Sequence, residues 1–242
     1  MRVTTFDAVL TRVLKDDPGR PLVTFYDDAT GERIELSRIT YANWVAKAAS
    51  LLVDEHDLTR GDTLRIDLPP HWLGPVFLGA AWTAGLMVSD ADDPDAVVCG
   101  PNSVVAWAER AAELPVLACA LLPLGVRFAE PLPEGVHDVG VEVWSQPDAF
   151  VPYDPPIDTD PAYDLAGEHR THAELWIAAA AGDLVTDGGR LLSVANPTSP
   201  SGIATFAEPL ARGGSLVLVA QADRERLEAT YVAERATARF PA

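Results

Sequence analysis

The sequence predicts an α/β protein in which one or more mostly parallel sheets are flanked by helices. Short apolar runs alternate along the chain with segments whose apolar residues recur at helical spacing. The apolar runs are nearly continuous, which is typical of strands buried on both faces. A strand–helix–strand unit also lies between Leu58 and Ser89, and such a unit implies parallel strands joined by a right-handed crossover.

This central unit consists of three segments. A strand over 63–68 is ended by two prolines, and the segment 71–84 then predicts a helix. Gly85 is its C-terminal stop, and 86–88 begins the next strand. Small residues on one face of the helix would allow it to lie close to a sheet, so we expect this helix in the core.

Before the central unit, the pattern predicts a helix, a hairpin and a second helix. Apolar residues at helical spacing predict the first helix over 5–14. The hairpin has strands at 22–26 and 33–36, because a turn-rich segment separates two strand-like runs. Thr40 is expected to cap a long helix that runs to Leu52.

After Ser89 the chain again alternates strand and helix, with strands at 96–99 and 115–121 around a helix at 103–112. The segment 127–163 is rich in proline and acidic residues. A flexible linker is one interpretation of it. Three aromatic residues favour burial, so we expect an ordered, covered loop with an isolated strand at 139–144. These aromatic residues are Trp144, Phe150 and Tyr153.

The C-terminal part continues the pattern. Thr171 is expected to cap a helix through Ala181, with Glu174 completing a capping box. Strands at 190–195 and 215–219 are expected in the same mostly parallel sheet as the central strands. The connecting and final elements are a loop at 196–202, a helix at 203–210, a turn at 213–214 and a helix at 223–235. The expected divisions are an α/β part at 1–126, the loop at 127–163 and a second part at 164–242.

Composition limits the classes of function. The 242 residues are 48% hydrophobic, so the chain can bury the core of one large or two small domains. A net charge of −18 argues against nucleic acid and against anionic membrane surfaces. Cys99 and Cys119 lie in apolar runs and form no disulfide or zinc pattern. The N-terminus has no apolar signal core. We expect a cytoplasmic protein without a cofactor.

The uncharged stretch from Leu68 to Ser89 could also be interpreted as a membrane span. Prolines and glycines interrupt it, aspartates flank it, and no basic cluster would set an orientation. A buried helix followed by a strand explains this stretch better, so we expect no membrane insertion.

Several local sequences resemble the adenylate-forming enzymes, a superfamily that includes acyl-CoA synthetases, luciferases and peptide-synthetase adenylation domains. Up to Ser89, the resemblance rests on ITYANWVAKAASLL, LTRGDTLRIDLPPHW and a small-residue helix ending in AGLMVS. Further along it rests on THAELWIAAA, RLLSVANPTSPSG and EPLARGGSLVLV. The chain as a whole resembles a short actinobacterial family related to these enzymes. The resemblance implies their N-terminal scaffold, because the pieces before Ser89 carry no chemistry in the superfamily.

The chain departs from this superfamily where the phosphate loop is expected. That loop is a Ser/Thr/Gly run ending in Pro-Lys-Gly, whose amides and lysine hold the phosphates of the nucleotide. Here the segment reads TDPAYDLAGEHRTH, with one glycine and no lysine. Asp160, Asp164 and Glu168 would repel a triphosphate. The superfamily's Gly-x-Thr-Glu motif, ribose-binding aspartate and C-terminal lysine would lie beyond residue 242. We therefore expect a scaffold that does not form adenylates and has no catalytic residues.

One cluster of histidine and glutamate residues is a candidate metal site. Glu168, His169, His172 and Glu174 are close in sequence, but only His172 and Glu174 fall securely on the expected helix. Side chains two positions apart on a helix do not converge, so we interpret this segment as a solvated helix start and expect no metal. His71 and Trp72 are similarly expected to be packed aromatic side chains.

Two functional hypotheses remain. The first is a non-catalytic remnant of the adenylation scaffold that binds a protein or a small ligand. The second is an enzyme of another kind, or an acyl- or nucleotide-binding protein, with a pocket at the helix start and the following polar loop. The candidate pocket residues are Thr171, His172, Asn196, Thr198, Ser199 and Ser201. We favour the first and expect a homodimer or a protein partner, with Ser215 to Arg235 contributing to the contact.

Overall fold

The computed structural model describes residues 4–241 and divides into two compact units. The first unit comprises residues up to Ala42, Pro70–Pro75 and the residues from His172 onward. The second comprises Asn43–Pro69 and Val76–Thr171. Each unit is assembled from separate stretches of the chain. The domain boundaries expected from the sequence stay a prediction.

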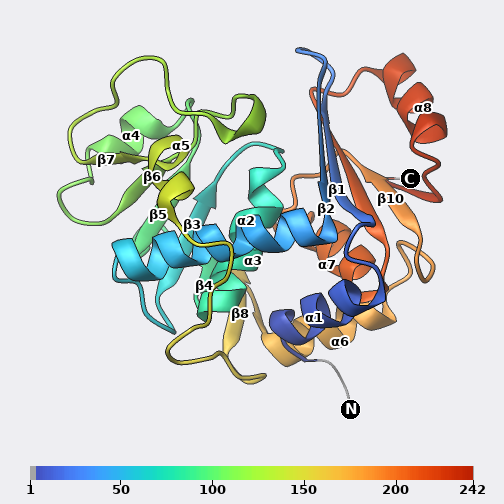
Figure 1. The fold of residues 1–242 in the computed structure, drawn as a ribbon, viewed down its shortest axis with the longest axis horizontal. Helices are drawn as coiled ribbons and strands as arrows, with labels where there is room; N and C mark the ends of the chain where they lie inside the picture. The colour runs from blue at the N-terminus through green and yellow to red at the C-terminus, as the bar shows by residue number, and fades with distance from the viewer. Residues whose placement is uncertain (1–3, 242) are drawn as a thin grey trace. The chain divides into compact units, whose positions relative to one another are not determined.

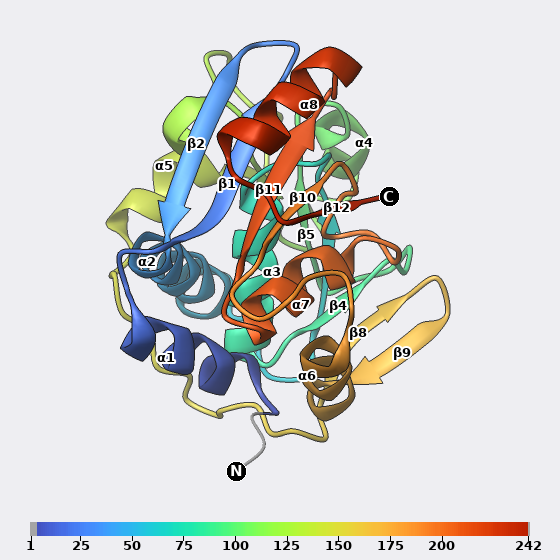
Figure 2. The same cartoon turned by 90° about the vertical axis from the view of Figure 1, so that its right-hand side faces the viewer.

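The first unit is built on a five-stranded sheet in the order β12-β10-β11-β1-β2. Neighbouring strands are parallel except for the β1–β2 hairpin. Figure 2 shows β2, β1, β11 and β10 side by side, with α8 lying over them. The strands are β1 (Pro21–Asp27), β2 (Glu32–Ser37), β10 (Arg190–Ser193), β11 (Ser215–Ala220) and β12 (Ala238–Phe240).

Successive side chains of a strand point to opposite faces of the sheet. Because β11 is buried at every position, helices cover both of these faces. Val217 and Val219 of β11 form a buried cluster with Leu192, and Leu227 of α8 (Arg224–Ala233) packs against it. Another helix, α7 (Ile203–Ala211), contacts β10 and β11 and also packs against α1 and α6. The latter two helices are α1 (Phe6–Asp16) and α6 (His172–Ala181).

The second unit is built on a seven-stranded sheet in the order β7-β6-β5-β3-β4-β8-β9, and only β9 is antiparallel to its neighbour. In Figure 1, α4 and α5 lie beside β5, β6 and β7. The strands are β3 (Thr63–Asp67), β4 (Met87–Ser89), β5 (Ala96–Cys99), β6 (Val116–Ala118), β7 (Val136–Asp138), β8 (Pro161–Leu165) and β9 (Glu168–Thr171).

The remaining helical elements link or cover these strands. Helix α3 joins β3 to β4, and α2 continues directly into the π-helical segment η1. Their bounds are α2 (Arg38–Ser50), η1 (Leu51–Glu55), α3 (Leu73–Ala84), α4 (Val104–Ala108), η2 (Pro123–Gly125), α5 (Val139–Glu142) and η3 (Val143–Ser145).

The predicted fold class is confirmed, and so are its central features. The strands β3 and β4 are parallel, and α3 is buried along most of its length. The expectation of one sheet is wrong, because β10 and β11 pair with each other and with β1 rather than with the central strands. Whether Ser215 to Arg235 contribute to an interface stays a prediction, but the strand within this segment offers little free surface. This strand is buried at every position, because it lies between β10 and β1.

Two local predictions are corrected by capping. Helix α2 begins at Arg38 rather than after Thr40, because the Ser37 hydroxyl accepts a hydrogen bond from the Thr40 amide at 3.2 Å. The segment 139–144 is helical rather than a strand. Asp138 accepts a hydrogen bond from the Gly140 amide at 2.9 Å and so caps α5.

The expected cover over the aromatic residues of 127–163 is also wrong for two of the three. The Trp144 side chain is 54% exposed and lies edge-on to Trp44, while Tyr153 is 87% exposed. Phe150 is partly buried. An edge-to-face contact with Trp44 therefore takes the place of burial for Trp144.

Candidate functional site

The place expected for a phosphate loop is occupied by a tight β-hairpin. Strands β8 and β9 are joined by two residues alone, and Leu165 pairs directly with Glu168. The two turn residues, Ala166 and Gly167, both have positive φ, at 51° and 77°. This pairing of two left-handed residues is the conformation that two-residue hairpins require. The backbone therefore turns back at once and forms no extended loop.

Two polar groups on this hairpin already have partners. The Ala166 amide donates to the Asp90 carboxylate at 2.8 Å, and the Arg170 guanidinium donates to Glu168 at 2.9 Å. Burial, followed by the nearby Glu168 carboxylate, raises the pKa of Tyr163. An incoming polyphosphate would thus meet carboxylates and an arginine that already has a partner.

The polar loop before α7 is held together by hydrogen bonds between its own residues. The Asn196 side-chain oxygen accepts from the amide of Thr198 at 3.2 Å and from its hydroxyl at 3.0 Å. The Ser199 hydroxyl donates to the Asn196 carbonyl at 2.7 Å. A Cβ on Gly202 would lie 1.8 Å from that same carbonyl oxygen, so the turn requires glycine there. These side chains build the turn, and Ser201 is exposed.

The predicted pocket residues at the helix start fall in different units. Thr171 ends β9 in the second unit, and His172 begins α6 in the first. His172 is fully buried, whereas the neighbouring His169 is exposed. Whether any of the six candidates binds a ligand stays a prediction.

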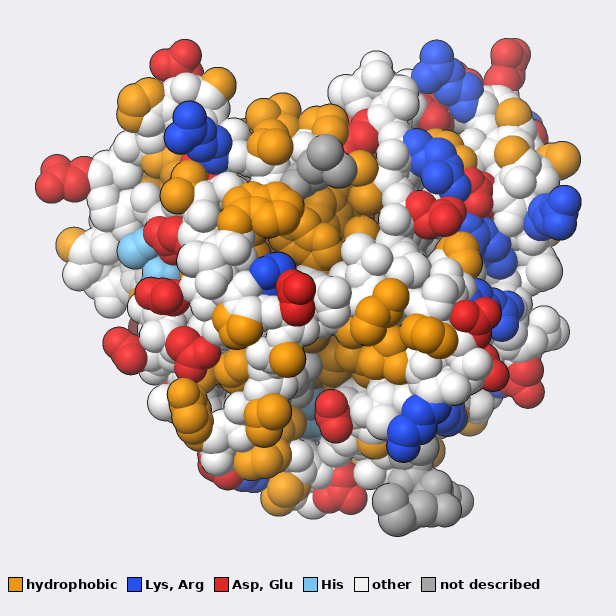
Figure 3. All heavy atoms as spheres, in the orientation of Figure 1, with side chains coloured by type: hydrophobic (Ala, Val, Ile, Leu, Met, Phe, Trp, Pro, Cys, Tyr) orange, Lys and Arg blue, Asp and Glu red, His pale blue; other side chains and the backbone are white. Residues whose placement is uncertain are grey.

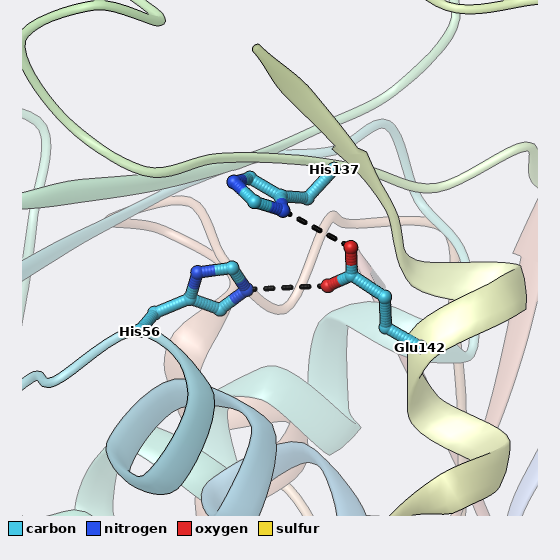
Figure 4. Close-up of side chains that lie close together, drawn as sticks. All are labelled: His56, His137 and Glu142. Atoms are coloured by element: carbon cyan, nitrogen blue, oxygen red, sulfur yellow. Dashed lines mark hydrogen bonds and ion pairs between the residues drawn. The ribbon is translucent and has the colours of Figure 1, made fainter.

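Three donor side chains that the sequence analysis did not bring together lie close in the second unit. They are His56, His137 and Glu142, and Figure 4 shows both imidazole rings facing the carboxylate. Within 4–241 this is the one group of three metal-ligating side chains whose donor atoms lie within 4.8 Å of one another. His137 and Glu142 are five positions apart, but no periodicity connects them to His56.

His71, Cys99 and Cys119 are buried titratable groups that lie among packed apolar side chains. His71 and Trp72 are 4% and 1% exposed, as expected for packed aromatic side chains. Burial lowers the pKa of His71 to about 4, and its Nδ1 accepts from the Leu73 amide at 3.3 Å. Burial raises the pKa of Cys99 to about 12 and that of Cys119 well above its ordinary value. None of these groups is poised as a general base or nucleophile at neutral pH.

Each unit has a cavity beside paired arginines. In the first unit a cavity of about 400 Å³ is lined by Arg12, Arg212 and Asp187 among others, and Arg212 contacts Asp187 at 2.9 Å. In the second unit a cavity of about 90 Å³ lies beside Arg60 and Tyr153. Because Arg212 also donates to two backbone carbonyls, a ligand anion would have to compete for it.

Comparison with known proteins identifies the family. No family model matches the chain. A TIGR03089 family protein of Mycobacterium tuberculosis (strain ATCC 25618 / H37Rv) is 36% identical over 245 residues, covering 97% of each chain. This chain belongs to the TIGR03089 family. The resemblance predicted from the sequence is thereby confirmed at the level of family and fold.

Solved structures show which fold the TIGR03089 chain shares. A Brucella canis acyl-CoA synthetase matches with a TM-score of 0.77 at 16% identity, over 96% of this chain and 46% of the synthetase. The N-terminal domain of FACL13 from Mycobacterium tuberculosis matches at 0.72 and 16% identity, over 96% of this chain and 61% of the domain. A benzoate CoA ligase from Burkholderia xenovorans LB400 matches at 0.72 and 20% identity, over 96% and 49%.

The chain thus spans about half the length of the first of these enzymes and has the fold of their N-terminal part. Within the described residues no helix is long and apolar enough to cross a membrane.

Proposed function

We propose that this TIGR03089 protein is a non-catalytic binding module on an adenylate-forming scaffold and that it does not form adenylates. The observation that carries the proposal is the two-residue turn at Ala166 and Gly167 in place of a phosphate loop. An extended glycine-rich loop presents several free amides to an anion. A tight hairpin offers at most two, and one of these already donates to Asp90.

The charges near the turn support the same conclusion. Adenylate formation requires donors and cations around the triphosphate as pyrophosphate leaves, and such charge stabilisation is usually the largest catalytic contribution. On this hairpin Arg170 is paired with Glu168, and Asp164 adds a further carboxylate. Removing one well-placed donor from an enzyme typically costs about 10²–10³ in kcat. Loss of the whole cradle should therefore reduce adenylation to background.

The decisive experiment is ATP–pyrophosphate exchange with the full chain and a panel of aliphatic and aromatic carboxylic acids. A full-length acyl-CoA synthetase serves as the positive control. We expect no exchange above the protein-free background and no thermal stabilisation by ATP with Mg²⁺. Exchange above background would contradict the proposal. A parallel variant with His169→Ala and Arg170→Ala, both exposed positions, would show whether that activity arises at the hairpin.

Exposed apolar side chains support a protein as the ligand, in the first instance a second copy of the chain. Val151 and Tyr153 are 81% and 87% exposed, and Val141 and Ile157 are about half exposed. They all lie within 141–157, between the edge strand β7 and strand β8. Apolar groups concentrated in one exposed segment are typical of interaction surfaces.

Sedimentation over a concentration series tests this part separately. We expect self-association of the wild-type chain, and a shift towards the monomer when Val151 and Tyr153 are both replaced by serine. The matched control is Val232→Ser on α8, which removes a side chain that is 73% exposed within the segment originally expected to mediate contact. A wild-type monomer at every concentration would refute self-association. An effect of Val232→Ser alone would assign the interface to α8.

A further inference from the structure

The cluster of His56, His137 and Glu142 joins three separate elements of the second unit. His56 directly follows the π-helical segment η1, His137 is the middle residue of β7, and Glu142 is the last residue of α5. One Glu142 oxygen lies 3.3 Å from His56 Nε2, and the other lies 3.0 Å from His137 Nδ1 (Figure 4). The two imidazole rings are 4.3 Å apart between centroids.

An ordinary ion-pair cluster is the simplest alternative, but it explains the arrangement poorly. The His56 side chain is only 6% exposed, and its buried Nε2 contacts a Glu142 oxygen at 3.3 Å. Both rings could pair with Glu142 as cations only if two positive charges were held close together, which is unfavourable. Two imidazole nitrogens directed at one carboxylate are a donor set that zinc sites use.

We propose that His56 Nε2, His137 Nδ1 and the Glu142 carboxylate bind one divalent transition-metal ion of the zinc class. Zinc sites accept two histidines and one carboxylate together with water at the fourth position. Bonds of about 2.0–2.1 Å in a tetrahedral site place neighbouring ligand atoms about 3.3–3.5 Å apart. The two imidazole nitrogens lie 3.3 and 3.0 Å from different oxygens of Glu142, and one donor atom from each residue lies within 4.8 Å of the other two. The imidazole donors favour zinc over Mg²⁺ or Ca²⁺.

The surrounding structure holds two of the ligands before any ion arrives. The end of α2 is tied to the turn after α5, because Ser50 donates to the Gln146 side-chain oxygen at 2.8 Å and Gln146 donates to Glu55 at 3.2 Å. Glu142 lies on a helix capped by Asp138, which also accepts from the Phe128 amide at 3.0 Å. A π-helical segment immediately before His56 fits a site too, since such segments are rare and often occur at functional positions.

An ion could reach this site from solvent. His137 and Glu142 are 40% and 32% exposed, so the side opposite His56 is open to water. Figure 3 shows histidine side chains reaching the surface among acidic ones on the side of the molecule where α5 and β7 lie. The strongly negative chain raises the local concentration of cations, and a water-filled coordination position would remain.

The test is zinc binding by the tag-free, metal-stripped full chain, measured by calorimetry and by metal analysis after gel filtration. We expect one equivalent of Zn²⁺ per chain, a rise in melting temperature with Zn²⁺ but not with Mg²⁺, and visible absorption typical of a tetrahedral site with Co²⁺. His137→Ala and Glu142→Gln should each weaken binding at least about tenfold, which is the lower end of what even outer-shell changes cost.

The matched controls are His169→Ala and Glu130→Gln, which remove the same groups at exposed positions outside the cluster. Circular dichroism confirms that each variant is folded. Equal zinc binding by wild type, His137→Ala and Glu142→Gln would overturn the proposal, because the ion would then bind elsewhere. Absence of stoichiometric binding by the wild type would overturn it as well. Neither result depends on whether the chain forms adenylates.

Discussion

Lowering the pH from 7 to 4 should destabilise the folded protein through His71. This imidazole is 4% exposed and lies against Phe25 and Trp72, with ring centroids 4.8 and 5.5 Å away. Its Nδ1 accepts from the Leu73 amide, and its buried Nε2 makes no hydrogen bond. Because burial outweighs the opposite effect of Asp27, the pKa of His71 falls from 6.5 to about 4.

The sign follows from proton uptake. Between pH 6.5 and about 4 the unfolded chain binds a proton at this histidine and the folded chain does not. The contribution of His71 to stability is therefore fully present above about pH 6.5 and is lost progressively as the pH falls towards 4. At about 1.4 kcal/mol per pH unit, this single group should lower the free energy of unfolding by about 3 kcal/mol.

Urea unfolding of the wild type and of His71→Asn at several values between pH 4 and 7 measures this contribution. Asparagine keeps an acceptor for the Leu73 amide but does not titrate. The variant should lose about 3 kcal/mol less than the wild type across this range. The control His169→Asn, at an exposed position, should behave like the wild type. Parallel pH profiles for wild type and His71→Asn would refute the assignment of a buried neutral imidazole.

Three further predictions concern other buried groups. Arg38→Met should lower the free energy of unfolding, measured in urea, by about 3 kcal/mol or more. The reason is that the fully buried guanidinium donates to three backbone carbonyls and a carboxylate. The control Arg224→Met, at an exposed position, should leave the free energy of unfolding unchanged. Gly202→Ala should lower the free energy of unfolding by about 1–3 kcal/mol, because the added Cβ would lie 1.8 Å from the Asn196 carbonyl oxygen. An unchanged melting temperature would contradict this prediction. Cys99 and Cys119 should resist a thiol reagent at pH 8 until the chain is unfolded, because burial raises the pKa of both thiols. At the pKa of about 12 for Cys99, only about 10⁻⁴ of that thiol is ionised at pH 8. Rapid reaction of the native protein would exclude this account.

Local signals in the sequence were sufficient for most helices and strands. The helix over 71–84 and the strands around it were predictable because periodicity, two prolines and a C-terminal glycine all act within a few residues. The expectation that no phosphate loop forms here came from composition, since the segment TDPAYDLAGEHRTH has one glycine and no lysine. The hairpin at this place was not predicted, because β8 and β9 are short and are defined by their pairing.

Where a strand period and a helix period both fit the same residues, the helix cap determined which structure formed. Valines at 139, 141 and 143 alternate as in a strand, but 139 and 143 also lie on one face of a helix. Asp138 satisfies the free amide of Gly140, which favours the helix, and Val139 and Val143 are buried while Val141 is 52% exposed. The alternation alone could not distinguish these outcomes.

Only the tertiary structure decided which strands pair and which side chains meet. The N-terminal strand β1 lies beside β11, and β12 extends the same sheet, because parallel strands can be joined through distant parts of a chain. His56 is likewise far along the chain from His137 and Glu142. Nothing in their local sequences indicates that the turn after η1 faces the short helix α5. By itself the sequence predicted most of the elements, the fold class and the family resemblance. Long-range packing determined the two sheets and the three-donor cluster, since neither depends on neighbouring residues.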